Sequence, residues 1–291
     1  MGIYGLFLVA ACAVGLLMFG VCARHARISV WTVPVLAVLG VLLGVLCSRL
    51  YLHTLKYAVN GFGFEGFSVI SSRPYEYAMC GTLLGVVLAG VLTARMTKQS
   101  VLKILDAIAP AGLAALAVSR FGEHFSDFGW GQIYEDIKWQ FFPVGVQDIY
   151  GQWHFAVYML EGIFALLVCV RVLRSSSRRE GERFWKALLW LSVSQILCES
   201  LRAETIRWGF VRVQQLQCVV FIFLILIVFS GKAQSDRKLA AWLLFVFGVG
   251  IVAFMEYALD KIDALPNMVC YLIMASAVLS LGYMIERLRE A

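Results

Sequence analysis

Charged and polar side chains interrupt the apolar stretches of this 291-residue chain at four places. They are Arg120, Glu123 and His124; His154 and Glu161; Gln195, Glu199 and Arg202; and Arg49 and His53. Arginine can hold a phosphate through two parallel hydrogen bonds, and carboxylates and imidazoles can accept protons. These residue types therefore suit a site that binds an anionic headgroup and removes a proton from a second reactant.

Spacing predicts which of these side chains share a helix face. The three residues that begin with Arg120 lie three and four positions apart, so they share one face if the helix continues past them. The three that begin with Gln195 form one polar stripe, because they follow each other by four and then three positions. A charge inside a membrane helix is costly unless it is paired. Two interpretations stay open: buried ion pairs that fix helix register, or groups that converge on one cavity.

The composition indicates a polytopic membrane protein. Apolar residues make up 61% of the chain, charged residues only 15%, and the mean hydropathy is +0.80. Nine stretches are long enough to cross about 30 Å of hydrocarbon. They lie at 3–22, 30–52, 76–94, 101–119, 154–173, 185–201, 212–231, 239–259 and 265–286. We expect an all-α membrane bundle that forms a single integral domain over 1–291. The fourth and sixth stretches are the weakest, since Asp106 and Pro110 interrupt one and Gln195 and Glu199 the other.

The distribution of basic residues predicts the orientation. With the N-terminus outside, 16 of the 25 Lys and Arg residues fall in inner segments and 9 in outer ones. This bias predicts an N-out, C-in topology, and it explains the formal charge of +6 without a nucleic-acid partner.

The outer segments 53–75 and 120–153 are long and rich in Gly, aromatic and acidic residues, so we expect the chemistry to face outward. Within them, F-G-W-G-Q-I-Y at 128–134 and W-Q-F-F-P at 139–143 fit either an aromatic belt or a lid over a lipid pocket.

Several classes of site have no support in the sequence. It lacks Walker, G-x-G-x-x-G, H-E-x-x-H and G-x-S-x-G motifs, which argues against nucleotide, metalloprotease and serine-hydrolase sites. Its eight cysteines form no C-x-x-C pair and lie mostly in apolar runs, so we expect buried thiols rather than disulfides or a zinc site. No cofactor or metal ion is expected.

Short motifs along residues 35–230 suggest a family. They are C-G-T-L-L-G-V at 80–86, T-A-R-M-T-K at 93–98, K-I-L-D-A-I-A-P at 103–110, S-R-F-G-E-H-F-S-D-F-G-W-G at 119–131, M-L-E-G at 159–162, C-E-S-L-R at 198–202, and Q-L at 215–216 or Gln217. In order and spacing the chain resembles the bacterial prolipoprotein diacylglyceryl transferases. The resemblance implies a seven-helix core over 1–231 and an additional helix pair over 239–286.

The residues and the resemblance together define a candidate site. The candidate catalytic residues are Arg120, Glu123, His124, Glu199 and Arg202. The candidate substrate-binding residues are Cys80, Gly81, Gly122, Trp130, Gly131, His154, Glu161 and Gln195. Three positions depart from the family pattern: Cys80 replaces a His, Glu123 an Asn and Gln195 an Arg. Arg207 or Arg212 could replace the missing arginine from the outer loop.

The resemblance implies transfer of a diacylglyceryl group from phosphatidylglycerol to the lipobox cysteine thiol of a prolipoprotein. The site would face the outer leaflet of the bacterial plasma membrane, and the partners would be phosphatidylglycerol and the prolipoprotein signal peptide. Arg120 and Arg202 would stabilise the departing phosphate, with Glu123, His124 or His154 as proton acceptor. The alternative is a noncatalytic lipid-binding or scaffold protein that kept the fold while losing the catalytic His.

Overall fold

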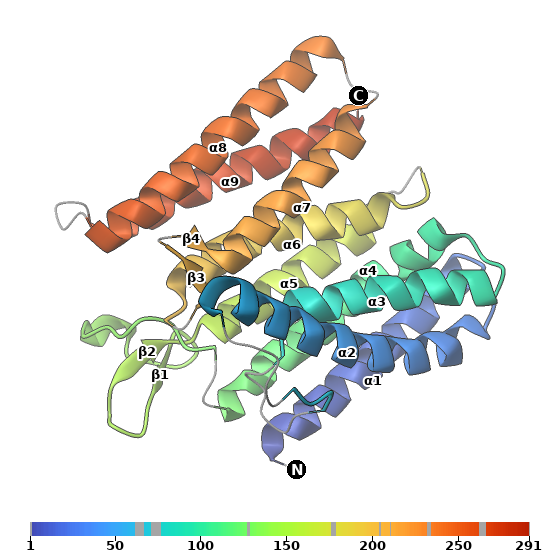
Figure 1. Ribbon diagram of the computed structural model, residues 1–291, viewed down its shortest axis with the longest axis horizontal. Coiled ribbons are helices and arrows are strands. Elements are labelled where there is room, and N and C mark those ends of the chain that lie inside the picture. Colours follow the sequence, from blue (N-terminus) through green and yellow to red (C-terminus); the bar gives the residue numbers. More distant parts are fainter. Residues whose placement is uncertain are drawn as a thin grey trace. The chain divides into compact units, whose positions relative to one another are not determined.

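The computed structural model describes residues 2–61, 67–70, 77–126, 129–175, 179–203, 205–209, 211–231, 234–261 and 266–290 (Figure 1). Nine α-helices lie within these ranges, near the nine predicted stretches. They are α1 (Ile3–His25), α2 (Thr32–Asn60), α3 (Met79–Met96), α4 (Val101–Gly122), α5 (Val157–Arg174), α6 (Glu182–Leu201), α7 (Val213–Ser230), α8 (Ser235–Lys261) and α9 (Asn267–Glu290). The short elements are the 3₁₀ turns η2 (Glu123–Phe125) and η3 (Ile137–Trp139) and the strands β1 (Gly145–Gln147), β2 (Trp153–Phe155), β3 (Arg207–Trp208) and β4 (Val211–Arg212).

Seven helices in the described ranges, α1 to α4 and α7 to α9, are long and apolar enough to cross a membrane. The predicted all-helical membrane bundle is thereby confirmed. The helices α5 and α6 have 18 and 20 residues and carry charges at their ends and along their length. The fourth stretch was predicted to be one of the weakest, but it forms a continuous helix that Asp106 does not interrupt. The Asp106 carboxylate accepts hydrogen bonds from the backbone N–H groups of Gly181 and Phe184, at 2.7 and 2.9 Å, and so caps the start of α6. The orientation across the membrane stays a prediction.

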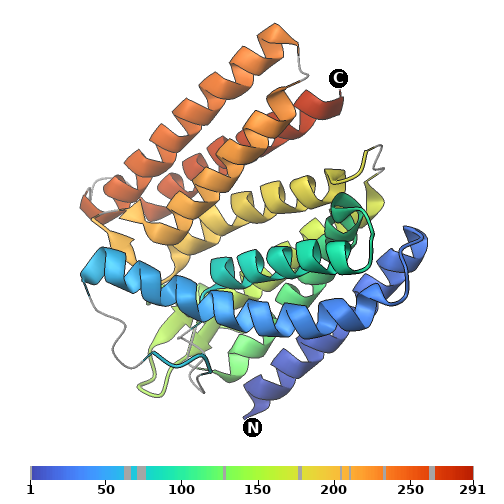
Figure 2. The same ribbon diagram turned by 45° about the vertical axis from the view of Figure 1, so that its right-hand side comes forward.

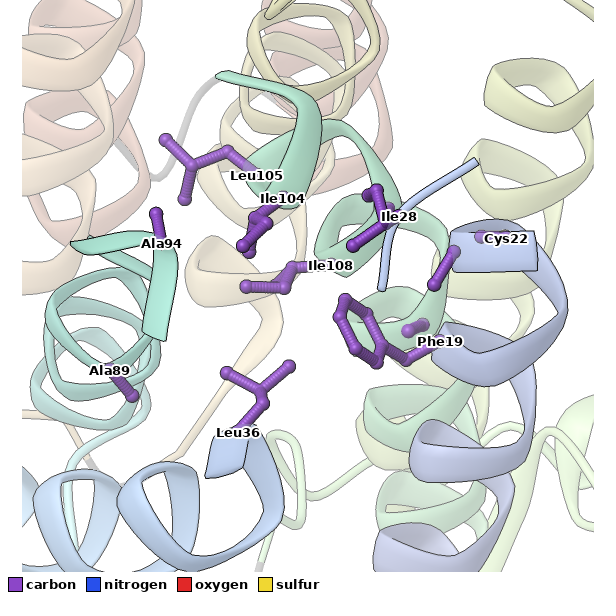
Figure 3. Close-up of a cluster of buried hydrophobic side chains, with 12 residues drawn as sticks. Phe19, Cys22, Ile28, Leu36, Ala89, Ala94, Ile104, Leu105 and Ile108 are labelled. Carbon is purple, nitrogen blue, oxygen red and sulfur yellow. The ribbon is translucent and has the colours of Figure 1, made fainter. Parts of the chain in front are cut away.

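The chain divides into two compact units. The first unit is Met1–Phe128 with Gly162–Ala187, and the second is Gly129–Glu161 with Leu188–Ala291. In the first unit α2 packs along α3, and α1 packs along α4 (Figure 2). Apolar side chains from these four helices form its core, with Phe19, Leu36, Ile104 and Ile108 pointing toward one another (Figure 3).

Glycines allow α2 and α3 to approach closely. Gly81 and Gly85, four positions apart, face α2, so that a Cβ added at Gly85 would lie 2.6 Å from the carbonyl carbon of Leu43. A Cβ added at Gly81 would lie 2.6 Å from the carbonyl oxygen of Cys47. Membrane helices use such pairs of small residues because lipid provides little hydrophobic force between helices. Gly81, a predicted substrate-binding residue, thus lies in a helix-packing interface.

In the second unit, α8 and α9 pack along each other and both contact α7 (Figure 1). The strands form two antiparallel pairs, β1 with β2 and β3 with β4. The predicted start of the fifth helix at 154 is wrong. Residues Trp153–Phe155 pair with Gly145–Gln147 as a sheet, so α5 begins only at Val157. His154 therefore lies on a strand and not on the same helix as Glu161.

Gly85→Ala should destabilise the protein, because the added methyl group meets the α2 backbone. We expect a loss of about 1–3 kcal/mol, the usual cost of overpacking. The measurement is the thermal transition of the purified protein in detergent. Gly40→Ala is the matched control, since Gly40 lies in α2 with nothing within 4 Å of an added Cβ. The control should be neutral or slightly stabilising, and equal transitions for the two variants would contradict the packing role of Gly85.

Candidate active site

Arg120 lies in the last turn of α4, in the first unit, and its side chain is almost buried. Its Nη1 donates a hydrogen bond to the carboxylate of Glu123, the first residue of η2. Its Nη2 lies 3.5 Å from the sulfur of Met79 at the start of α3. The predicted pairing of Arg120 with Glu123 is confirmed. These contacts place the guanidinium where the end of α4 meets the start of α3, where the buried Cys80 follows Met79.

The predicted common face of Arg120, Glu123 and His124 is only partly correct. The α-helix ends at Gly122, and the tighter turn that follows leaves the His124 side chain exposed beside Phe125, with ring centroids 5.1 Å apart. Gly122 allows this turn to lie against α1, since an added Cβ would lie 2.7 Å from Cγ of Phe7. Gly122 therefore has a packing role next to the Arg120–Glu123 pair.

Arg49 and His53 hold the segment that follows α2. Arg49 is buried, its Nε donates a hydrogen bond of 2.8 Å to the carbonyl of Ser68, and its guanidinium lies 5.5 Å from the ring centroid of Tyr77. His53 contacts the ring of Phe67 edge-on, with centroids 5.0 Å apart. These contacts are those of a structural arginine, which fixes backbone rather than presenting its guanidinium to a ligand.

Arg202 lies just after the end of α6, in the second unit, and two carboxylates fix its guanidinium. Its Nε and Nη2 bind the two oxygens of Glu161, at 3.0 and 2.7 Å, in a bidentate arrangement. The carboxylate of Glu199, the partner predicted from spacing, lies further away, at 3.8 Å from Nε. Both glutamates are buried. The sequence therefore identified the charged residues, but the main partner of Arg202 comes from another helix.

Backbone pairing brings Trp130 and Gly131 to Arg202. Gly131 and Arg202 form an isolated antiparallel bridge, and the Ala203 N–H donates a 3.2 Å hydrogen bond to the Trp130 carbonyl. A Cβ at Gly131 would lie 2.8 Å from the carbonyl oxygen of Leu201, so only glycine fits here without a shift. The predicted site residues Trp130, Gly131, Glu161, Glu199 and Arg202 thus lie together in the second unit. Convergence of this group with the Arg120 group on one cavity stays a prediction.

His154 is held between two oxygen acceptors. Its Nε2 lies 3.4 Å from the Asp148 carboxylate, its Nδ1 lies 3.2 Å from the Gly131 carbonyl, and its ring centroid lies 5.1 Å from that of Trp130. An imidazole with both nitrogens facing acceptors is suited to donating hydrogen bonds, and it is poorly placed to take a proton from a substrate. This geometry favours a role in which His154 fixes the β1–β2 hairpin against Gly131.

Arg212 and Glu256 form a buried pair that the sequence analysis did not assign. Arg212 Nε donates a 3.1 Å hydrogen bond to Glu256 of α8, and both side chains are almost fully buried. Glu256 also accepts hydrogen bonds from the Ser200 hydroxyl and from Gln215 Nε2, the latter at 2.6 Å. The sequence does contain a signal for this pair. Glu256 is an acid within an apolar stretch, and such a group requires a partner.

The contacts of Arg212 and Arg207 do not favour either of them as a replacement for the arginine that the family pattern has at Gln195, and this hypothesis stays untested. Arg212 is bound to Glu256 and to backbone carbonyls, while Arg207 forms an exposed pair with Asp260 at 3.0 Å. Gln195 is buried, and its Oε1 has no hydrogen-bond partner in the described part of the chain. Such an atom indicates a place where a water molecule or a polar ligand group would bind.

The thiols and acids do not form a metal site in the part of the chain that the structure describes. The eight cysteines all lie in the described part of the chain, none of them forms a disulfide, and six of them are buried.

Comparison with protein families assigns residues 1–231 to a known family. The matching model is that of the prolipoprotein diacylglyceryl transferases. This chain belongs to that family. The match ends directly after α7, so α8 and α9 lie outside it. The resemblance inferred from the motifs is confirmed, and the chain is a multi-pass membrane protein.

Individual relatives agree with this assignment. The chain is 25% identical over 213 residues to a phosphatidylglycerol–prolipoprotein diacylglyceryl transferase of Bacillus cytotoxicus, covering 70% of this chain and 78% of the relative. A Clostridium novyi protein of the same name is 29% identical over 204 residues, covering 67% of this chain and 78% of the relative. A Bacillus cereus protein of that name is 27% identical over 213 residues, with coverage of 70% and 78%.

The Asp148–His154 contact predicts pH-dependent stability of the β1–β2 hairpin. Desolvation raises the pKa of Asp148, but hydrogen bonds from the Gln152 N–H, the His154 ring and the Tyr150 N–H outweigh it, so this pKa lies below its ordinary value. A lowered carboxyl pKa stabilises the fold above the ordinary value of about 3.9, and the contribution disappears as the pH falls through the lowered pKa.

We therefore expect pepsin to cleave the exposed hairpin around Tyr150 more slowly in the wild type than in Asp148→Asn at about pH 5. The difference should shrink and vanish as the pH falls through the lowered pKa of the wild-type Asp148 carboxyl, where that group becomes protonated. Comparing the two proteins at each pH removes the pH dependence of the protease. Equal cleavage rates at pH 5 would show that the Asp148 charge contributes nothing to the hairpin.

Proposed function

We propose that this protein transfers the diacylglyceryl group of phosphatidylglycerol to the lipobox cysteine thiol of a prolipoprotein. Family membership over residues 1–231 and the names of the relatives support this activity. One observation links this activity to a place in the structure. The guanidinium of Arg120 is almost buried and is bound by Glu123 at the end of a membrane helix. We assign residues 1–231 as the transferase core and treat α8 and α9 as an additional pair.

The reaction is a substitution at carbon. The cysteine sulfur attacks the glyceryl carbon that carries the phosphate, the new C–S bond forms, and the C–O bond to phosphate breaks. The electron pair of that bond leaves with the phosphate oxygen as glycerol phosphate, and the thiol proton goes to a base. The protein must therefore supply a proton acceptor near the thiol and positive charge near the departing phosphate.

Arg120 is the candidate for the positive charge in the first unit. Glu123 binds one nitrogen, and a second nitrogen lies 3.5 Å from the sulfur of Met79, which is a weak acceptor. A phosphate oxygen is a much stronger acceptor than a thioether and would readily replace that contact. Arg202 is a separate candidate in the second unit, where Glu161 and Glu199 fix its orientation.

His124 is the candidate proton acceptor. Its side chain is exposed at the end of α4, whereas Glu123 is engaged by Arg120 and His154 lies between two acceptors. An imidazole that a substrate can reach is a common general base in enzymes. Cys80, where the family pattern has a His, is a buried thiol at the start of α3.

The departures at Cys80, Glu123 and Gln195 motivated the noncatalytic alternative. The relatives that the chain matches are named as transferases, and no observation specifically favours loss of activity. The substitutions at Cys80 and Gln195 are compatible with activity if other groups bind the substrates. We therefore keep the transferase as the proposed function, with its site facing the outer leaflet.

The test of the function is complementation of a bacterial strain depleted of its own diacylglyceryl transferase. We expect the full chain to restore growth and to add one diacylglyceryl group to a lipoprotein reporter, read as a mass increase. Membrane expression is checked by immunoblot. A reporter that stays unmodified at full expression would support the noncatalytic alternative.

Arg120→Lys should fold normally and lose activity by about tenfold or more. Lysine keeps the charge but cannot present two parallel donors to a phosphate, and a lost charged hydrogen bond costs about 1.5–3 kcal/mol. The measurement is the initial rate of reporter modification by purified protein. Arg207→Lys is the matched control, because Arg207 makes an exposed pair for which a point charge suffices. Full activity of Arg120→Lys would assign Arg120 to helix packing alone.

Topology is tested by cysteine labelling in intact cells, in a variant without the eight native cysteines. The excess of basic residues predicts that Tyr150→Cys reacts with a membrane-impermeant maleimide and that Ser176→Cys does not. Ser176 lies outside the described residues. Labelling of Ser176→Cys from outside would reverse the proposed orientation.

A further inference from the structure

Glu256 lies in α8, beyond the part of the chain that matches the family. Its carboxylate is almost fully buried. One oxygen accepts hydrogen bonds from Ser200 and Gln215, and the other accepts from Arg212 Nε at 3.1 Å. All three donors belong to the family-like region, on α6, β4 and the first turn of α7. A residue outside the family match therefore completes a buried polar network within it.

Arg212 connects this network to the end of α6. Its Nη1 donates hydrogen bonds to the carbonyl oxygens of Glu199 and Arg202, at 2.6 and 2.8 Å. The last carbonyls of a helix lack partners within the helix and carry partial negative charge, so a guanidinium placed there fixes the end of the helix. The two carbonyls belong to the two candidate catalytic residues of the second unit. The orientation of Arg202 thus depends on where Arg212 is held.

We propose that Glu256 is a positioning residue for Glu199 and Arg202, acting through Arg212. The helix pair α8–α9 would then contribute to the transferase site, because it supplies the carboxylate that positions these residues. The expected effect of Glu256 on the rate of transfer rests on the proposed function. Its expected effect on the order at the end of α6 can be tested without measuring activity.

The charges explain why Glu256 is needed. Arg212 in an apolar bundle requires a carboxylate, and two other buried acids of the second unit, Glu161 and Glu199, are turned toward Arg202. Without Glu256 the Arg212 guanidinium would be a buried cation with only backbone acceptors. It would then compete with Arg202 for the remaining carboxylates and release the end of α6.

A second set of contacts ties the helix pair to α6. The Trp190 indole N–H donates a 2.9 Å hydrogen bond to Glu286 of α9, and a Cβ at Gly282 would lie 3.1 Å from the Val193 side chain. The donor of this hydrogen bond is neutral and lies about three turns before the end of α6. Glu286 therefore provides a matched control: it is another buried acid of the same helix pair, without a link to Arg212 in the contacts just described.

The experiment compares full-chain Glu256→Gln, Glu256→Asp and Glu286→Gln. Each is purified in detergent, and folding is checked by its thermal transition. We expect Glu256→Gln to lower kcat by about tenfold to a hundredfold with little change in KM, because misplacing a reacting group affects the transition state more than binding. Glu256→Asp keeps the charge and should recover part of that loss. Glu286→Gln should retain wild-type kinetics.

The readout that needs no activity is hydrogen exchange of the backbone amides over 199–212. We expect faster exchange there in Glu256→Gln than in the wild type or Glu286→Gln, and a partial return in Glu256→Asp. In a double-variant cycle, Glu256→Gln combined with Arg212→Gln should be no worse than Arg212→Gln alone, because both remove the same link.

The possible failures are distinguishable. A wild type that modifies no reporter rejects the proposed function, while the exchange data still decide whether Glu256 holds the end of α6. Unchanged exchange over 199–212 in folded Glu256→Gln, or multiplicative losses in the cycle, overturns the positioning role. If neither Glu256 variant folds, Glu256 is a general fold residue and the proposal is also overturned.

Discussion

A charge inside an apolar helix bundle must have a partner, and this requirement organises the polar groups of the whole protein. Arg120 pairs with Glu123, Arg202 with Glu161, and Arg212 with Glu256. The first pair is local, at the end of α4, whereas the other two join residues 41 and 44 positions apart in the chain. An unpaired group at these positions would cost several kilocalories per mole, so the pairs restrict how the helices can pack. The same restriction fixes guanidinium groups in defined orientations, which is what binding a phosphate requires.

The arrangement of the charged residues also depends on close helix packing. Glycines between the helices let the helix ends that carry Arg120 and Met79 approach each other. Gly81 and Gly85 let α3 lie on the backbone of α2, and Gly122 lets the end of α4 lie on α1. Met79, at the start of α3, then reaches Arg120 at the end of α4. Gly81 and Gly122, which were predicted to bind substrate, thus also allow close approach between helices. The distinction matters because a packing glycine affects stability, whereas a binding glycine affects affinity.

The sequence predicted the helices and the charged residues well but predicted their partners poorly. Nine apolar stretches and the i, i+3 pair of Arg120 and Glu123 follow from periodicity, which is local. The bidentate partner of Arg202 is Glu161 on another helix, and no spacing rule reports a contact between helices 41 positions apart. His154 was placed on a helix because its neighbours are apolar, but strand pairing with residues 145–147 prevails there. Glu256 was overlooked because it lies beyond the family motifs.

The contacts of the two candidate arginines give them unequal capacity for an additional anion. Arg202 faces two carboxylates, so much of its charge is already neutralised, and a phosphate would have to compete with Glu161 for the same fork. Arg120 binds the Glu123 carboxylate, and its Nη2 lies beside a thioether, which accepts hydrogen bonds only weakly. Where the family has an arginine, Gln195 supplies no charge, and Arg212 is engaged by Glu256 and two carbonyls. These contacts favour Arg120 over Arg202 as the candidate for stabilising the departing phosphate.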